Sequence, residues 1–77
     1  MSQTPKIILG VDPGITYSGY GVVELYGNKL IHVASGTIGT PKASMDIPDR
    51  VKYHFQKLVE IIAKYSPNEM ALEKVFY

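Results

Sequence analysis

A single helix-type segment separates strand-type segments on either side of it, and this order constrains the fold more than any other feature. Apolar residues recur every three or four positions between residues 46 and 66, which predicts a helix with one buried face. Asp46 is suited to the N-cap position and Pro67 to ending the helix. A helix of this length between strands is typical of the crossover that joins two parallel strands. The residues of the predicted buried face are Val51, Phe55, Leu58, Ile62 and Tyr65.

Three strand-type segments precede the helix. Residues 6–11 are an apolar run rich in β-branched residues, and the turn-forming sequence Asp-Pro-Gly follows them directly. Apolar side chains at consecutive positions predict a strand that is covered on both faces. Residues 19–26 and 29–38 are expected to pair as a hairpin, because Gly27 and Asn28 between them tolerate the positive φ of a two-residue turn.

The fourth strand-type segment, residues 70–77, follows the helix. This order predicts an α/β fold with a mixed sheet: three antiparallel strands, the helix, and a fourth strand parallel to the first. An apolar strand at the end of a chain leaves an aggregation-prone sheet edge, so we expect the 77 residues to be a truncated part of one larger domain. The chain has no cysteine, which excludes disulfides and thiolate zinc sites as support for so small a core.

Charge and hydropathy exclude few functions. Eight Lys and Arg residues against seven Asp and Glu residues leave a net charge of +1, which neither favours nor excludes a nucleic-acid partner. No apolar stretch approaches the roughly 20 residues of a membrane span. The start of the chain also lacks the apolar core of a signal peptide. We therefore expect a cytoplasmic protein with no membrane partner.

Two carboxylates are the strongest candidates for chemistry. Asp12 lies at the C-terminal end of the first predicted strand, and Glu73 lies within the fourth. If these strands are parallel neighbours, both side chains reach one site. Paired carboxylates on a rigid sheet suit Mg²⁺, which is commonly held by one or two carboxylates together with a substrate phosphate. Two such ions promote phosphodiester hydrolysis by activating water and stabilising the leaving oxygen.

Each carboxylate also has a structural interpretation. An Asp before Pro-Gly is a common turn residue that caps its own backbone, and Glu73 also fits a solvated position on an edge strand. Strand alternation, however, places Glu73 with Ala71 and Val75 on an apolar face, whereas Lys74 points to the opposite face. A charge on an apolar face must be paired, exposed or bound to a metal, so the position of Glu73 modestly favours a metal.

The remaining candidates are weaker. The glycines near the start match neither a Walker nor a dinucleotide-binding spacing, so we expect them to form the turn and to allow close backbone approach. His32 and His54 lack the spacing of metal ligands and are predicted to be structural. Ser18 belongs to no recognisable nucleophile motif. Phe76 is either a core residue, which the sequence alone favours, or an aromatic that stacks on a base.

A resemblance to one family rests on three runs taken together, in this order and spacing: Ile-Leu-Gly-Val-Asp-Pro-Gly at 8–14, Ser-Gly-Tyr-Gly-Val at 18–22 and Ala-Leu-Glu-Lys-Val-Phe at 71–76. From Lys6 onward the chain resembles the first half of the RuvC Holliday-junction resolvases. The resemblance implies a ribonuclease-H-like fold, with residues 1–77 as the N-terminal portion of a single nuclease domain.

The same resemblance implies a homodimeric endonuclease that nicks opposed strands of four-way DNA junctions in recombination and repair. It implies Mg²⁺ as cofactor, with Mn²⁺ as a substitute, and a branch-migration motor as partner. Asp12 matches the first catalytic metal-binding acid and Glu73 the second, and Phe76 and Lys74 are the candidate DNA contacts. The family usually has Thr where this chain has Ser18. Because family members carry their last acidic ligands further along, we expect little or no nuclease activity from the 77 residues alone.

Two other functions stay open at the level of sequence. Actin-like and sugar-kinase ATPases also carry Gly-x-Asp-x-Gly after a first strand, with Ser or Thr soon after it, as Thr16 is here. They offer no equivalent of the run at 71–76. The second alternative is a non-catalytic fragment that binds DNA, or pairs with another chain, without cutting.

Overall fold

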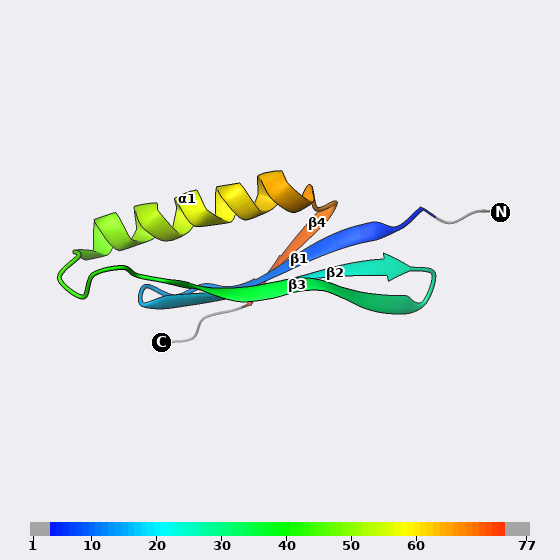
Figure 1. Cartoon of the computed structure of the whole chain (residues 1–77), viewed down its shortest axis with the longest axis horizontal. Coiled ribbons are helices and arrows are strands. Elements are labelled where there is room, and N and C mark those ends of the chain that lie inside the picture. The colour runs from blue at the N-terminus through cyan, green and yellow to red at the C-terminus, as the bar shows by residue number, and fades with distance from the viewer. Residues whose placement is uncertain (1–3, 74–77) are drawn as a thin grey trace.

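A four-stranded mixed sheet carries one helix on one of its faces in the computed structural model, which describes residues 4–73 (Figure 1). The strand order is β3-β2-β1-β4. β1 pairs antiparallel with β2 and parallel with β4, and β2 pairs antiparallel with β3. The predicted arrangement is therefore confirmed. The elements in chain order are β1 (Lys6–Asp12), β2 (Tyr17–Tyr26), β3 (Lys29–Gly39), α1 (Ile47–Tyr65) and β4 (Glu69–Leu72).

The hairpin between β2 and β3 turns where the sequence predicts. Gly27 adopts a φ of 62°, in the left-handed region that favours glycine. β2 begins two residues earlier than predicted, because Tyr17 and Ser18 already pair with Gly39 and Ile38 of β3. The hairpin strands therefore reach back to the loop that follows β1.

The core lies between α1 and one face of the sheet. Leu9 of β1 and Val22 of β2 are register partners, and both are fully buried. Val11 is 3% exposed and extends the same cluster along β1. Three side chains of α1 pack against this cluster: Leu58, Ile61 and Tyr65.

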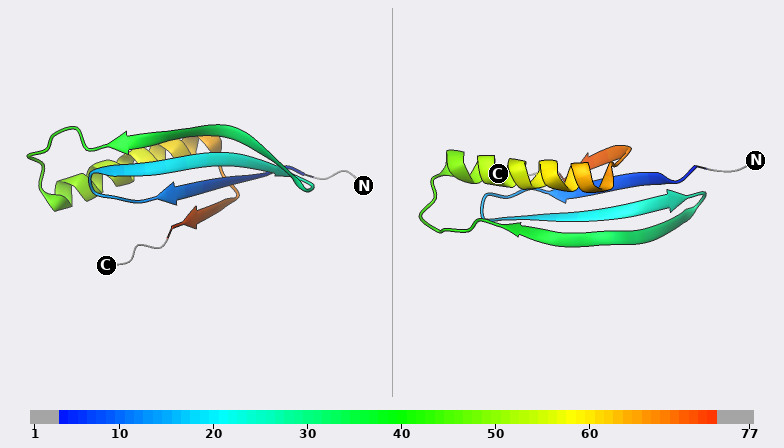
Figure 2. Two further views of the ribbon diagram at one scale, coloured as in Figure 1. Left: turned by 90° about the horizontal axis from the view of Figure 1, so that it is seen from below. Right: turned by 45° about the horizontal axis from the view of Figure 1, so that its top comes forward.

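The other face of the sheet is open within residues 4–73. Figure 2 shows α1 along one face of the sheet and no second helix opposite it. Side chains alternate along a strand, so Ile8 and Gly10 of β1 lie on the open face, where they are only half-buried. The prediction that β1 is covered on both faces is therefore wrong for the part of the chain that the structure describes.

The helix begins and ends as the sequence predicts. The Asp46 side chain accepts a hydrogen bond from the Asp49 N–H at 3.0 Å, and Pro48 lies in the first turn. At the other end Ser66 takes the left-handed conformation, and its N–H donates to the Ile62 carbonyl at 2.8 Å. These caps satisfy backbone groups that a helix end otherwise leaves unpaired.

The buried face of α1 differs from the predicted face by one residue along part of its length. Val51 and Phe55, which are predicted to be buried, are 55% and 64% exposed. Leu58 and Tyr65 of the predicted face do pack against the core, and they are joined by His54 and Ile61 in place of Phe55 and Ile62. These residues have the same helical spacing, but a prediction from the spacing of apolar residues does not include a histidine. The burial of His54 depends on its hydrogen bonds with Ser18 and Thr40, which the pattern of apolar residues along the helix does not predict.

Candidate metal centre

The two predicted carboxylates meet at the C-terminal ends of β1 and β4. In the parallel pair, Val11 is opposite Leu72, so Asp12 and Glu73 occupy the next position on their respective chains. The sequence predicts that Glu73 lies within the fourth strand. In the structure, Glu73 lies directly after β4. Its N–H nevertheless donates to the Val11 carbonyl at 3.0 Å, which continues the pairing of β4 with β1 up to the carboxylate.

Both carboxylates lie on the face that α1 leaves open. Val11 points into the core, so strand alternation turns Asp12 to the opposite face. By the same alternation Glu73 shares the face of Ala71, whose register partner Gly10 is on the open face. Both Asp12 and Glu73 are exposed. The sheet thus presents two neighbouring negative charges to one solvent-facing region.

The structural interpretation of Asp12 as a turn cap does not hold. A capping Asp accepts a hydrogen bond from the N–H two residues further on, which here belongs to Gly14. That N–H donates instead to the Ser18 hydroxyl at 3.1 Å. The turn is closed by Ser18, and its geometry does not require the Asp12 carboxylate.

A hollow of about 440 Å³ adjoins the two carboxylates. Gly10 pairs with Gly21 on one side and with Ala71 on the other, so a row of minimal side chains crosses three strands. A Cβ atom at Gly21 would meet nothing within 4 Å, and one at Gly10 would meet only the Gly21 carbonyl at 3.9 Å. Larger side chains would therefore fit at Gly10 and Gly21, and the glycines leave this space beside Asp12 and Glu73 unfilled.

The chemistry of the two residues fits a hard divalent cation. The ion pairs within residues 4–73 are Lys6–Glu69 and Lys57–Glu60, so no cation of this region is paired with either carboxylate. Two neighbouring carboxylates repel each other and are stabilised by a cation that both contact. Over the same residues, no cluster of three or more metal-ligating side chains occurs. Asp12 and Glu73 would hold the cation, and water and a substrate phosphate would complete its coordination.

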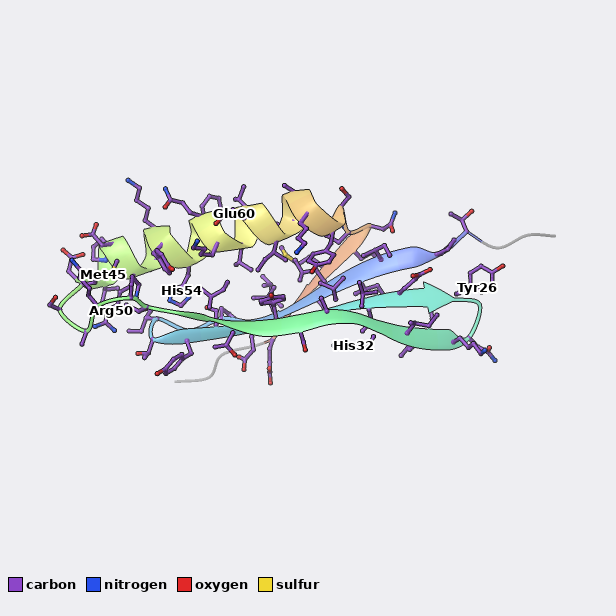
Figure 3. All side chains as sticks on the ribbon, viewed as in Figure 1. Tyr26, His32, Met45, Arg50, His54 and Glu60 are labelled. Carbon is purple, nitrogen blue, oxygen red and sulfur yellow. The ribbon has the colours of Figure 1, made fainter. Side chains whose placement is uncertain are left out.

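The loop that follows Asp12 is tied to α1 by His54, which projects from the helix toward the sheet (Figure 3). Nδ1 of His54 lies 2.7 Å from the Ser18 hydroxyl, and Nε2 lies 2.8 Å from the Thr40 hydroxyl. His54 is 5% exposed, and burial of this kind agrees with the predicted structural role. Its connection to Ser18 and Thr40 was not predicted, since no motif links three residues so far apart in sequence.

The other predicted site residues do not join this centre. His32 is exposed on β3, where Nε2 lies 3.1 Å from the Ser35 hydroxyl. Lys74 and Phe76, the predicted DNA contacts, lie outside the described residues 4–73. No helix within that range is long and apolar enough to cross a membrane.

Sequence comparisons identify the family of the chain. The family model described as crossover junction endodeoxyribonuclease RuvC matches residues 8–77. The crossover junction endodeoxyribonuclease RuvC of Dechloromonas aromatica is 47% identical over 76 residues, which are 99% of this chain and 42% of that protein. The protein of the same name from Janthinobacterium sp. is 52% identical over 69 residues, 90% of this chain and 37% of its own length. The chain thus spans less than half the length of these relatives.

Solved structures agree with this assignment and with the ribonuclease-H-like sheet order. The structure of T. thermophilus RuvC in complex with Holliday junction substrate matches with a TM-score of 0.78 and 29% identity, over 92% of this chain and 46% of that chain. The Aquifex aeolicus PPX-GPPA enzyme matches with a TM-score of 0.66 but only 15% identity, over 90% and 26% of the two chains, so it shares the fold alone. The 77-residue chain belongs to the RuvC family of crossover junction endodeoxyribonucleases.

Proposed function

We propose that this chain contributes the Asp12–Glu73 metal centre to a DNA endonuclease that resolves four-way junctions by hydrolysis of phosphodiester bonds in recombination and repair. The observation that carries the proposal is the meeting of both carboxylates on the open face of the sheet. The family is one of metal-dependent nucleases, and a relative was solved in complex with Holliday junction substrate. Mg²⁺ is the proposed cofactor, and Mn²⁺ is expected to substitute for it.

The residues of the chain have separate tasks in this reaction. Asp12 and Glu73 hold the metal, which when bound activates water and stabilises the leaving oxygen. The paired β1 and β4 strands fix the spacing of the two carboxylates, as a rigid scaffold must. Gly10 and Gly21 keep the neighbouring sheet surface free of side chains, which allows a sugar-phosphate backbone to approach the carboxylates closely.

The wider organisation is proposed on the same family basis. Residues 1–77 are the N-terminal portion of a single ribonuclease-H-like nuclease domain, whose other residues supply the remaining acidic ligands. The domain acts in the cytoplasm as a homodimer alongside a branch-migration motor. Lys74 and Phe76 contact the junction DNA. Membership of the RuvC family leaves the ATPase alternative without support, whereas the non-catalytic alternative is decided by experiment.

A chimera tests the proposed function. Residues 1–77 replace the matching part of the Dechloromonas aromatica relative, and nicking of labelled four-way junctions is measured in Mg²⁺. We expect the chimera to nick junctions and the 77-residue chain alone to show little or no activity, because two carboxylates are an incomplete two-metal site. A chimera that shifts junctions in a gel without cutting them would favour the non-catalytic alternative. Robust nicking by the 77-residue chain, if it is lost in Asp12→Asn, would contradict the expectation that the metal site of this chain alone is incomplete.

A further inference from the structure

We propose that His54 is a positioning residue for the Asp12 side of the metal centre, acting through Ser18 and Thr40 on the loop at 13–16. This inference rests on the proposed function, since it assigns Asp12 to a metal. His54 lies on α1, on the opposite side of the sheet from the carboxylates, and it reaches toward the loop (Figure 3). Its influence on the site is therefore indirect.

Both ring nitrogens of His54 make hydrogen bonds, and the partners of the neighbouring hydroxyl groups indicate which nitrogen donates and which accepts. The Thr40 hydroxyl donates its one hydrogen to the Ile15 carbonyl at 2.6 Å. Nε2 of His54, 2.8 Å from the same hydroxyl oxygen, is therefore the donor in that contact. In the neutral ring Nδ1 is then an acceptor. The Ser18 hydroxyl lies 3.1 Å from the Gly14 carbonyl and 2.7 Å from Nδ1, and it directs its one hydrogen to the nearer Nδ1.

The hydrogen bonds beyond these two hydroxyls converge on the loop that leaves Asp12. The Gly14 N–H donates to the Ser18 hydroxyl, and the Ile15 carbonyl accepts from Thr40. In addition, the Thr40 N–H donates to the Thr16 carbonyl at 2.9 Å. His54 therefore links α1 to both halves of a loop that begins one residue after the carboxylate.

Apolar packing does not replace these hydrogen bonds. An open groove of about 520 Å³ lies between the loop and the N-terminal half of α1, and its apolar side chains, among them Val51 and Phe55, are exposed to solvent. Ser18 and His54 beside it are only 2% and 5% exposed. The loop itself is tight, because a Cβ atom at Gly14 would collide with the Tyr17 carbonyl oxygen. Without His54, the Ser18 and Thr40 hydroxyls that bond to the two halves of the loop each lose a partner, and because the loop begins one residue after Asp12, a shift of the loop reaches the backbone of Asp12.

The test uses His54→Gln in the full-length chimera, with Ile61→Val as the matched control. Glutamine can pair with one hydroxyl but lacks the two opposed ring nitrogens, whereas Ile61 packs against the Leu9 cluster from the same helix. We expect His54→Gln to weaken Mg²⁺ binding about threefold to tenfold in calorimetry, because small displacements of a positioned group have large effects. Exchange of the Gly14 and Thr40 amide hydrogens, followed by nuclear magnetic resonance, should be about tenfold faster. Ile61→Val should leave both readouts unchanged while lowering the Tm.

A second variant, Thr40→Val, keeps the side-chain shape, removes one hydroxyl, and is expected to act in the same direction as His54→Gln. Unchanged Mg²⁺ affinity and unchanged amide exchange in both variants would overturn the positioning role. The role would also be overturned if Ile61→Val lowered Mg²⁺ affinity as much as His54→Gln does. Asp12→Asn separates this failure from a failure of the proposed function. If Mg²⁺ affinity does not fall in Asp12→Asn, the metal assignment is wrong and the inference fails with it. If it falls there but not in His54→Gln, only the inference fails.

Discussion

Asp12→Asn and Glu73→Gln, each placed in the chimera, are expected to lower junction cleavage by at least about 10³-fold while junction binding persists. Each change keeps the size of the side chain but removes one negative charge and one oxygen ligand from the pair. Losing several kcal/mol of transition-state stabilisation from a misplaced metal corresponds to a factor of about this size. Single-turnover cleavage gives the rate, and gel shifts with four-way junctions give the binding.

Glu69→Gln is the matched control for this pair. Glu69 lies on β4 and on the same sheet face as Glu73, but at the other end of the strand, where it pairs with Lys6 at 2.9 Å. Because that ion pair is exposed, its loss is expected to change stability and cleavage little. A parental cleavage rate in Asp12→Asn or Glu73→Gln, or an equal loss in Glu69→Gln, would show that the metal-ligand assignment is wrong.

Leu9→Ala is expected to have the largest effect on stability. Leu9 is fully buried at the centre of the cluster between the sheet and α1, and truncation there leaves a cavity. Such changes typically lower the free energy of unfolding by about 2–5 kcal/mol. In a chimera of this size, the Tm is expected to fall by about 5–15 °C, measured by thermal unfolding followed by circular dichroism.

Leu30→Ala is the control for the core. It removes the same atoms from a side chain that is 67% exposed near the hairpin turn, so the expected change is within about 0.5 kcal/mol. Equal destabilisation by Leu9→Ala and Leu30→Ala would mean that the core is not centred on β1.

The sheet and the meeting of the carboxylates were predictable because they depend on signals that lie close together in sequence. The Asp-Pro-Gly turn marks where β1 ends, and one helix before the last strand favours a parallel return. Together these place Asp12 and Glu73 at the same end of neighbouring strands. The metal role of the pair remains a prediction, since its evidence is chemical fit and family membership.

The features that the sequence did not predict depend on long-range contacts. A run such as β1, apolar at consecutive positions, does not say which of its faces a single helix will cover. The rotation of the buried face of α1 follows from His54, which is buried because hydroxyls from two other segments meet its ring. The hollow beside the carboxylates likewise needs the register that aligns Gly10 with Gly21 and Ala71.

The joint binding of one divalent cation by Asp12 and Glu73 is tested most directly by adding a small amount of Mn²⁺ to the isotope-labelled chimera. Bound Mn²⁺ broadens the amide signals of nearby residues in nuclear magnetic resonance spectra. We predict that the signals of Asp12, Gly19 and Glu73 broaden first, and that Glu73→Gln reduces the broadening at Asp12. Equal broadening at the half-buried Glu24 and the exposed Glu60, or undiminished broadening at Asp12 in Glu73→Gln, would contradict a shared metal centre.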